Sequence, residues 1–317
     1  MNRQTNKVDL VIIGGGPAGM SAALIAGRTL LNTVIINAEK PRNSVTTASH
    51  GFLSRDGVHP LELLSISRQQ LEKYKTINYV KGTVIDANPL EQGFEVKLED
   101  GTNLDTENII FASGTKENIS KIGLNGIEKV YGKSVYPCPF CDGWEHKGEK
   151  LAVFGDNPMA AEFAKVISNW SNDIIVFTNG NRVISDESKA VLNKGGISVI
   201  EDEIAELAAD EHGQLQAIQL RNGTAIEREA GFVTDTHEEP ASNLPLKLGV
   251  GLTTNGWGMQ VLDADEVGKT NVHGIFVVGD AKSGFGGLLA SARDGAACVE
   301  TLLHERVHHR WSALAIS

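Results

Sequence analysis

Cysteine, positive charge and long apolar runs are all scarce in this sequence of 317 residues. Three cysteines cannot build a disulfide framework, so we expect a reducing, cytoplasmic compartment. No apolar stretch reaches the roughly 18 to 20 residues that a membrane-spanning helix needs, and no signal-peptide cleavage pattern follows the start, MNRQTNKVDLVIIGGG. The net charge of −11 argues against a nucleic-acid surface. We therefore expect neither membrane nor nucleic acid as a partner.

A strand–turn–helix–strand pattern occurs twice. VDLVIIGGGPAGMSAALIAGRTLLNTVIIN (8–37) reads as an apolar strand, a glycine turn, a helix and a second apolar strand, and KLAVFGDNPMAAEFAKVISNWSNDIIVFTNG (150–180) repeats that order. Continuous apolar strands joined through helices are typical of buried parallel sheets. The sequence predicts an α/β fold with two Rossmann-like dinucleotide-binding domains, each a three-layer structure around a mainly parallel sheet.

Antiparallel additions to these sheets are also predicted. Residues 94–104 and 215–227 alternate apolar and polar side chains around the turn dipeptides Asp100-Gly101 and Asn222-Gly223, which indicates two β-hairpins. The closing stretch, 274–307, predicts a further strand, glycine turn and long helix.

The first glycine turn has the complete dinucleotide motif. Gly14, Gly16 and Gly19 form G-x-G-x-x-G around Pro17 and Ala18, directly after a strand and at the start of a helix. The first glycine permits the turn, the second lets a pyrophosphate approach the backbone, and the third lets the helix pack on the strand. Free N–H groups at the helix N-terminus would bind the phosphates.

The acid expected at the end of the second strand is absent. Asn37 occupies that place, with Glu39 two residues later. Asparagine can still hydrogen-bond a ribose hydroxyl, and Glu39 is either a second ribose ligand or a solvated loop residue.

The second glycine turn is incomplete. Residues 155–160 read G-D-N-P-M-A, so Asn157 replaces the middle glycine and Pro158 follows it. A side chain at the middle position crowds the place where a pyrophosphate must come close. Only Arg182 follows the partner strand, with no basic cluster for a 2′-phosphate. The sequence predicts that this domain binds NADPH poorly or not at all.

The stretch VYPCPFCDGWEHKG (135–148) contains two of the three cysteines, Cys138 and Cys141. A zinc site normally needs four ligands, and no second C-x-x-C or nearby Cys/His pair is present, so we predict no metal. The tail histidines at 304, 308 and 309 are typical of a surface helix face. Close spacing lets one thiolate attack a disulfide and its neighbour resolve the mixed disulfide, while Asp142 shuttles the proton. Cys298 is predicted to be a buried small hydrophobe.

These motifs together resemble the low-molecular-weight thioredoxin reductases. The glycine turn, C-x-x-C-D-G, second turn and late G-D occur in the family's order over nearly the whole chain. The resemblance implies a discontinuous FAD domain, 1–115 and 246–317, interrupted by an NAD(P)H-type domain, 116–245, that carries the cysteines. It also implies that Cys141 faces the flavin, that Cys138 meets the substrate disulfide, and that Asp142 is the acid–base group. It further implies a homodimer.

Alanine and glycine stretches complete the implied FAD site. Ala112-Ser113-Gly114 resembles the family's A-T-G, and Gly279-Asp280 its late G-D. The positions assigned to FAD, from the residues or from the resemblance, are Gly14, Gly16, Pro17, Ala18, Gly19, Asn37, Arg42, Asn43, His50, Gly51, Ala112, Ser113, Gly114, Gly279 and Asp280.

The direction of electron flow stays open at this point. The family's second glycine turn and its H-R-R-type arginines are absent, and KPRNSVTTASHGFLSRDG (40–57) looks closer to the branch that includes the dithiol oxidases of gliotoxin and holomycin biosynthesis. Those oxidases typically carry histidine where this chain has Asp142. The principal prediction is an FAD-dependent thiol–disulfide oxidoreductase acting on a thioredoxin-like protein or a small dithiol or disulfide. The alternatives are an oxygen-dependent dithiol oxidase and a non-catalytic flavin redox sensor.

Overall fold

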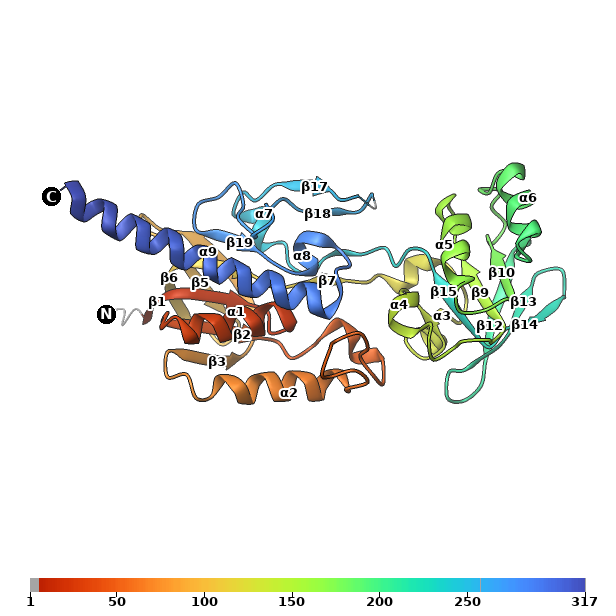
Figure 1. The fold of residues 1–317 in the computed structure, drawn as a ribbon, viewed down its shortest axis with the longest axis horizontal. Helices are drawn as coiled ribbons and strands as arrows, with labels where there is room; N and C mark the ends of the chain where they lie inside the picture. The colour runs from red at the N-terminus through yellow and green to blue at the C-terminus, as the bar shows by residue number, and fades with distance from the viewer. Residues whose placement is uncertain (1–5, 257, 317) are drawn as a thin grey trace. The chain divides into compact units, whose positions relative to one another are not determined.

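The computed structural model describes residues 6–256 and 258–316 (Figure 1). By its internal contacts the chain divides into two compact units. The first consists of Met1–Arg42, Pro60–Lys116 and Glu238–Ser317, and the second of Asn43–His59 and Glu117–His237. Each unit is described by itself below.

The first unit is built on a seven-stranded sheet. Its strands β3, β2, β1 and β6 are parallel neighbours, β19 adds in parallel to β6, and β5 and β4 continue the sheet in antiparallel pairing. The elements of this unit are β1 (Asn6–Ile13), α1 (Pro17–Arg28), β2 (Thr33–Asn37), α2 (Pro60–Leu71), β3 (Ile77–Lys81), β4 (Val84–Pro89), β5 (Phe94–Leu98), β6 (Asn103–Phe111), β7 (Thr115–Lys116), β16 (Glu239–Pro240), α7 (Leu244–Lys247), β17 (Leu252–Thr254), β18 (Gln260–Leu262), β19 (Ile275–Val277), α8 (Asp280–Ser283) and α9 (Gly287–Ile316).

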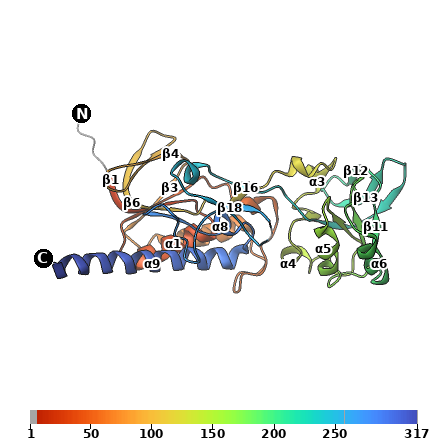
Figure 2. The same ribbon diagram turned by 90° about the horizontal axis from the view of Figure 1, so that it is seen from above.

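Two apolar clusters lie on opposite faces of this sheet. One joins alternate sheet residues such as Leu10 and Ile12 to α1 and α9, and the other joins Val11 and Ile13 to the β4–β5 hairpin and β18. Helices α1 and α9 lie side by side in Figures 1 and 2. They can approach closely because α9 has a glycine at the contact: a Cβ on Gly295 would lie 1.9 Å from the carbonyl oxygen of Ala18.

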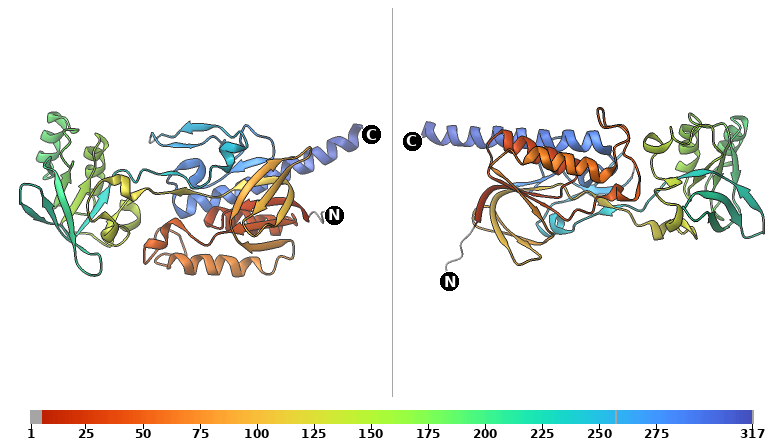
Figure 3. Two further views of the ribbon diagram at one scale, coloured as in Figure 1. Left: turned by 180° about the vertical axis from the view of Figure 1, so that it is seen from behind. Right: turned by 90° about the horizontal axis from the view of Figure 1, so that it is seen from below.

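The second unit has a five-stranded parallel sheet in the order β11-β10-β9-β15-β8 and a separate antiparallel sheet, β12-β13-β14, which can be followed in Figure 3. The apolar cores on its two faces pack against α5 and α6 on one side and against α3 and the antiparallel sheet on the other. The elements of this unit, with a 3₁₀ turn η1 (Arg42–Val45) at its boundary, are η2 (Ile119–Ile122), α3 (Ile127–Val130), β8 (Val135–Tyr136), α4 (Pro139–Asp142), β9 (Leu151–Phe154), α5 (Met159–Ile167), β10 (Ile174–Phe177), α6 (Asp186–Lys194), β11 (Ser198–Ile200), β12 (Ile204–Ala209), β13 (Leu215–Leu220), β14 (Ala225–Glu227) and β15 (Ala230–Val233).

The predicted α/β architecture and both hairpins are confirmed, with β5 pairing with β6 and β13 with β14. The strand, turn and long helix predicted at the end are β19, α8 and α9. The unit boundaries differ in detail from the predicted domain limits. Residues 43–59 pack with the second unit, and Lys116 and residues 238–245 belong to the first because β7 pairs with β16.

In the described ranges, no helix is both long and apolar enough to pass through a bilayer. Among those same residues, no group of three or more His, Cys, Asp or Glu side chains is arranged to hold a metal ion. The tail histidines lie exposed on α9, and Cys298 is fully buried in it, as predicted.

Candidate active site

The two cysteines of the C-x-x-C motif lie on one short turn of helix, α4. Cys138 is the N-cap residue in an extended conformation, and Pro139 begins the helix, where its fixed φ is favourable and its missing N–H has no partner to lose. The backbone N–H of Cys141 donates to the carbonyl oxygen of Cys138 over 3.2 Å. This turn brings the Sγ atoms to 2.7 Å from each other, so the free thiols can close to a disulfide with little movement.

The two thiols differ in environment. Cys138 is buried and Cys141 is partly exposed. The hydrogen bond from the Cys141 thiol lowers the pKa of Cys138; burial opposes this shift, and the backbone N–H groups of Cys141 and Phe140 add to it. A lowered pKa increases the share of Cys138 that is present as the nucleophilic thiolate.

Asp142 directly follows the pair and ends α4. Burial raises the pKa of its carboxyl from 3.8 to about 7, the negative charge of Glu145 adds to the rise, and the charge of His50 opposes it. A carboxyl that titrates near neutral pH can both give and take a proton in a cell. Asp142 therefore has the property that a general acid–base group for thiol exchange requires.

Three further residues of the second unit, Tyr136, His146 and Glu149, form a chain of contacts. Tyr136 donates its hydroxyl hydrogen to the carbonyl oxygen of Lys133 over 2.5 Å, and its Oη lies 3.2 Å from Nε2 of His146. Nδ1 of His146 lies 2.7 Å from Oε2 of Glu149. Burial raises the pKa of Tyr136, with the charges of Asp142, Glu145 and Glu149 adding to it, so the phenol stays protonated. Only the His–x–x–Glu spacing of the last pair was readable in advance.

The carboxyl ends of three neighbouring strands form the other candidate site. Gly14 follows β1, Ala112 follows β6, and Gly279 comes two residues after β19. They lie together: a Cβ on Gly14 would be 2.2 Å from the carbonyl oxygen of Ala112, and one on Gly279 would be 2.9 Å from Cβ of Ala18. Ligands of open α/β sheets bind at this edge of the strands.

This edge fits a dinucleotide. Gly16 is the N-cap of α1, no side chain caps the helix, and a Cβ on Gly16 would meet nothing within 4 Å. In the described part of the chain, the Ser113 Oγ is buried and has no hydrogen-bond partner. Open space at the middle glycine, a first turn of α1 that no side chain caps and an unsatisfied hydroxyl suit a pyrophosphate and its ribityl neighbour.

Asn37 and Glu39 are already engaged within the protein. Asn37 is buried, donates to Tyr79 Oη over 2.9 Å and accepts from the backbone N–H of Glu39 over 3.0 Å. The Glu39 carboxylate pairs with Lys81 at 2.5 Å. Of the two ribose candidates, Glu39 has the more accessible side chain, because Asn37 is buried whereas the Glu39 side chain is 30% exposed.

Arg42 and Asp280, both assigned to FAD, meet in one cluster. Their side chains approach to 3.2 Å, and Arg42 also pairs with Glu238 at 3.0 Å and lies over the Phe285 ring at 4.6 Å. The carbonyl oxygen of Gly114 accepts a hydrogen bond from the backbone N–H of Ala241, three residues after Glu238.

Asn43, His50 and Gly51 lie in the second unit. Asn43 donates to the Ser49 hydroxyl over 3.2 Å, and Gly51 donates its N–H to Asp56 over 2.8 Å. Nε2 of His50 lies 3.4 Å from Oε1 of Glu145, three residues after Asp142.

The second glycine turn is closed by its own side chains. Asn157 accepts the backbone N–H of Met159, the first residue of α5, over 2.9 Å. A Cβ on Gly155 would lie 2.6 Å from the Thr234 hydroxyl. The N–H that would face a phosphate is therefore occupied.

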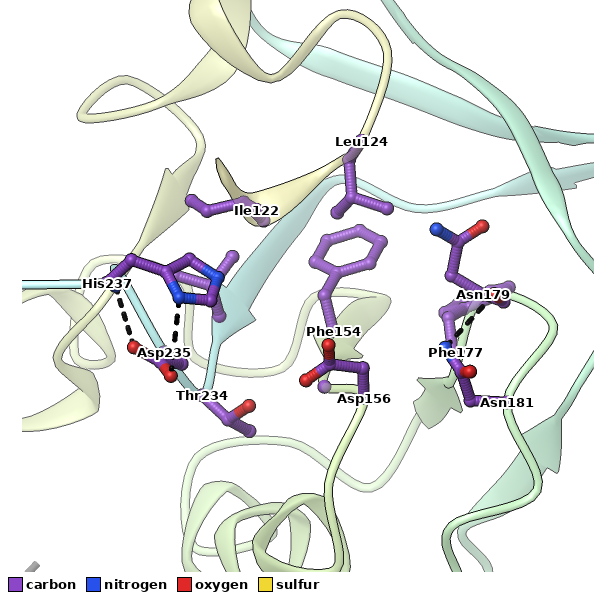
Figure 4. Close-up of a pocket in the computed structure, with 12 residues that line it drawn as sticks. Ile122, Leu124, Phe154, Asp156, Phe177, Asn179, Asn181, Thr234, Asp235 and His237 are labelled. Atoms are coloured by element: carbon purple, nitrogen blue, oxygen red, sulfur yellow. Dashed lines mark hydrogen bonds and ion pairs between the residues drawn. The ribbon is translucent and has the colours of Figure 1, made fainter. Parts of the chain in front are cut away.

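A pocket lies beside this turn at the carboxyl ends of β9, β10 and β15. Figure 4 shows Asp156, Asp235 and His237 around the ring of Phe154, with no lysine or arginine among the described residues that line it. Two carboxylates at this place repel the phosphates of a dinucleotide. The lining residues are Ile122, Leu124, Phe154, Gly155, Asp156, Phe177, Asn179, Asn181, Val233, Thr234, Asp235 and His237.

Comparison with known proteins bears on these two sites. Residues 8–296 match the family model described as pyridine nucleotide-disulphide oxidoreductase. The chain is 27% identical over 316 residues to a probable thioredoxin reductase of Arthroderma benhamiae, covering 88% of this chain and 75% of that protein. It is 27% identical over 290 residues to thioredoxin reductase tcpT of Claviceps purpurea, covering 87% of each.

A solved structure shares the whole fold. The putative thioredoxin reductase TrxB of Bacillus anthracis superposes with a TM-score of 0.89 at 31% identity, over 96% of this chain and 99% of that one. The resemblance inferred from the motifs is confirmed, and so is the fold of two dinucleotide-binding domains.

Proposed function

The chain belongs to the pyridine nucleotide-disulphide oxidoreductase family, whose thioredoxin reductase-like members use FAD, and from this premise we propose that Cys138 and Cys141 are its redox-active pair. The observation that carries the proposal is the pair of sulfur atoms 2.7 Å apart beside the Asp142 carboxyl. Substrates are protein or small-molecule dithiols and disulfides. A cytoplasmic homodimer is part of the proposal: the small number of cysteines supports the compartment, and analogy with the family supports the dimer.

The chain's own residues account for the exchange chemistry. The Cys138 thiolate attacks a substrate disulfide, one substrate sulfur leaves, and Asp142 gives it a proton. Cys141 then attacks the sulfur of Cys138 in the mixed disulfide, and its thiol proton passes by way of Asp142 to the second substrate sulfur, so that the substrate leaves as a dithiol and the Cys138–Cys141 disulfide remains. Run in reverse, the same steps oxidise a dithiol.

FAD would be held in the first unit by the turn at Gly14, Gly16 and Gly19, with Ser113 and Asp280 nearby. Bound there, it would supply a two-electron carrier. The fit rests on the open space at Gly16 and the unsatisfied Ser113 hydroxyl.

A second candidate is favoured by the closed second turn. The hydrogen bond that Asn157 accepts from the Met159 N–H and the carboxylates of Asp156 and Asp235 oppose binding of a nicotinamide dinucleotide. A reductase needs such a nucleotide, and a dithiol oxidase does not. Oxygen-dependent oxidation of a dithiol is therefore the direction that this unit supports.

Anaerobic titration of the flavin-loaded protein tests both candidates. Absorbance near 450 nm is followed while NADPH, NADH and then a dithiol are added. Bleaching by the dithiol alone, followed by recovery in air and formation of the disulfide, supports the oxidase direction. Rapid bleaching by NADPH makes the protein a reductase. Bleaching without turnover of any disulfide or dithiol leaves only a redox sensor and overturns the enzymatic proposal.

A further inference from the structure

The loop that contains His50 holds this side chain beside Glu145, three residues after Asp142. Ser49 and Val58 form a bridge, with the Ser49 N–H donating to the Val58 carbonyl oxygen over 2.8 Å. The loop packs against the remainder of the second unit: a Cβ on Gly132 would lie 2.7 Å from Cγ2 of Val45. The position of His50 is thus set by backbone pairing and packing.

Carboxylates lie on both sides of the His50 ring. Nδ1 is 3.6 Å from Oδ1 of Asp56, and Nε2 is 3.4 Å from Oε1 of Glu145. Only 22% of the His50 side chain is exposed, whereas Asp56 is 70% exposed. Each ring nitrogen of His50 therefore has a carboxylate within ion-pair distance, so the orientation of the ring is fixed from both sides.

The charges of His50 and Glu145 act on Asp142 in opposite directions. The positive charge of His50 favours the Asp142 carboxylate, and the negative charge of Glu145 disfavours it. Asp142 in turn disfavours the Cys138 thiolate. The proton held at Asp142 therefore depends on His50, and the reactivity of Cys138 depends on Asp142.

We propose that His50 is a positioning residue for the redox pair: its side chain, held between Asp56 and Glu145, sets the pH range over which Asp142 exchanges protons with the cysteines. This proposal rests on the proposed function of Cys138, Cys141 and Asp142. The other ionisable groups that face this neighbourhood are Tyr136, His146 and Glu149. The contacts that single out His50 are those with Glu145 and Asp56, which none of these three makes in the described structure.

The test compares His50→Gln with Glu145→Gln. The protein is reduced with a dithiol and then alkylated with iodoacetamide over a range of about four pH units around neutral, from pH 5 to pH 9. Mass spectrometry measures the alkylation rate at Cys138 and at Cys141. Turnover of a disulfide or dithiol is measured over the same range. In His50→Gln, the part of the pH–rate profile that reports the titration of Asp142 (its Asp142-dependent limb) should move to higher pH by about 0.5 to 1 unit, because a neighbouring positive charge is lost. Loss of the negative charge should move it to lower pH in Glu145→Gln.

Two controls isolate the effect. His212→Gln removes an exposed histidine elsewhere in the second unit and should leave the limb in place. In an Asp142→Asn background, His50→Gln should no longer move the profile, because its effect passes through Asp142. A purely structural role for His50 would lower rates at every pH without moving the limb.

The outcomes separate this proposal from the proposed function. Opposite shifts in the two variants support the role of His50, and superposable wild-type and His50→Gln profiles overturn it. If His50→Gln fails to fold, the Glu145→Gln shift decides, since an unmoved limb there also overturns the proposal. If the wild type turns over no dithiol or disulfide, the proposed function fails, while the alkylation profile still decides whether His50 acts on Asp142.

Discussion

The two glycine turns follow equivalent strands in the two units, yet they end in opposite states. At the first, Gly16 leaves the start of α1 open and uncapped. At the second, Asn157 occupies the N–H of Met159, and Asp156 lies in the adjacent pocket. The residues at the second and third positions of the turn, Gly15 and Gly16 against Asp156 and Asn157, thus separate a turn that can admit a pyrophosphate from one that satisfies its own backbone. In the proposed function, the second unit contributes the thiols and the first contributes the nucleotide site.

The largest effect is expected from removing the thiols of the second unit. Replacing Cys138 or Cys141 by serine should abolish thiol–disulfide turnover, because neither a mixed disulfide nor its resolution remains available, while flavin content stays unchanged. Cys298→Ala is the matched control and should keep turnover, since Cys298 is buried within α9. Full activity in Cys138→Ser would contradict the redox role of the pair.

The next effect concerns the first turn. Gly16→Val should weaken FAD binding by at least about tenfold, the equivalent of 1.4 kcal/mol, because its side chain fills the space next to the helix N-terminus. The fold should persist, since a Cβ there meets no other atom within 4 Å. Flavin absorbance per protein measures the loss. Asn157→Val changes the same place in the second turn and should leave flavin content as in the wild type; an equal loss in both variants would mean that the turns do not differ.

Asp142 provides an effect that depends on pH. Asp142→Asn should lower turnover about a hundredfold, typical for loss of a general acid–base group, and remove the limb of the pH profile near 7. The substitution also affects stability. Because burial raises the pKa of Asp142 from 3.8 to about 7, the folded state binds more protons than the unfolded chain between these values, and wild-type stability falls as the pH rises through them.

Urea unfolding checks that sign. Asp142→Asn should gain stability relative to the wild type at pH 8 and gain less, or nothing, at pH 4. A gain that is the same at both pH values would show that Asp142 is not held protonated by burial.

The smallest effect is expected from substitutions that make the second glycine turn resemble the first. The double variant Asp156→Ala/Asn157→Gly frees the Met159 N–H and removes one carboxylate from the pocket. NADPH binding, followed by nucleotide fluorescence, should tighten by about two- to fivefold, in line with 0.3–1 kcal/mol for a charge at a helix N-terminus. Asp186→Ala, which removes an exposed first-turn acid from α6, is the control. Tight NADPH binding by the wild type would erase the contrast between the turns.

Much of the fold was predictable because its signals are local. Both strand–turn–helix–strand repeats, both hairpins and the closing long helix lie where apolar periodicity and turn dipeptides indicated them. The boundary between the two units was harder to predict from the sequence. Residues 43–59 contain no element of their own beyond a 3₁₀ turn and one isolated bridge, so contacts made far along the chain decide where they pack.

The site divides in the same way. Spacing alone indicated that Cys138, Cys141 and Asp142 act together. It also indicated that Gly14, Gly16 and Gly19 lie at one helix start, because such motifs fix their own geometry within a few residues. Spacing could not reveal that His50 faces Glu145, or that Tyr136 contacts His146, since these contacts join side chains that only the folded unit brings together. Burial is likewise a property of the whole unit, and it is burial that changes Asp142 from an ordinary acid into one that titrates near neutral pH.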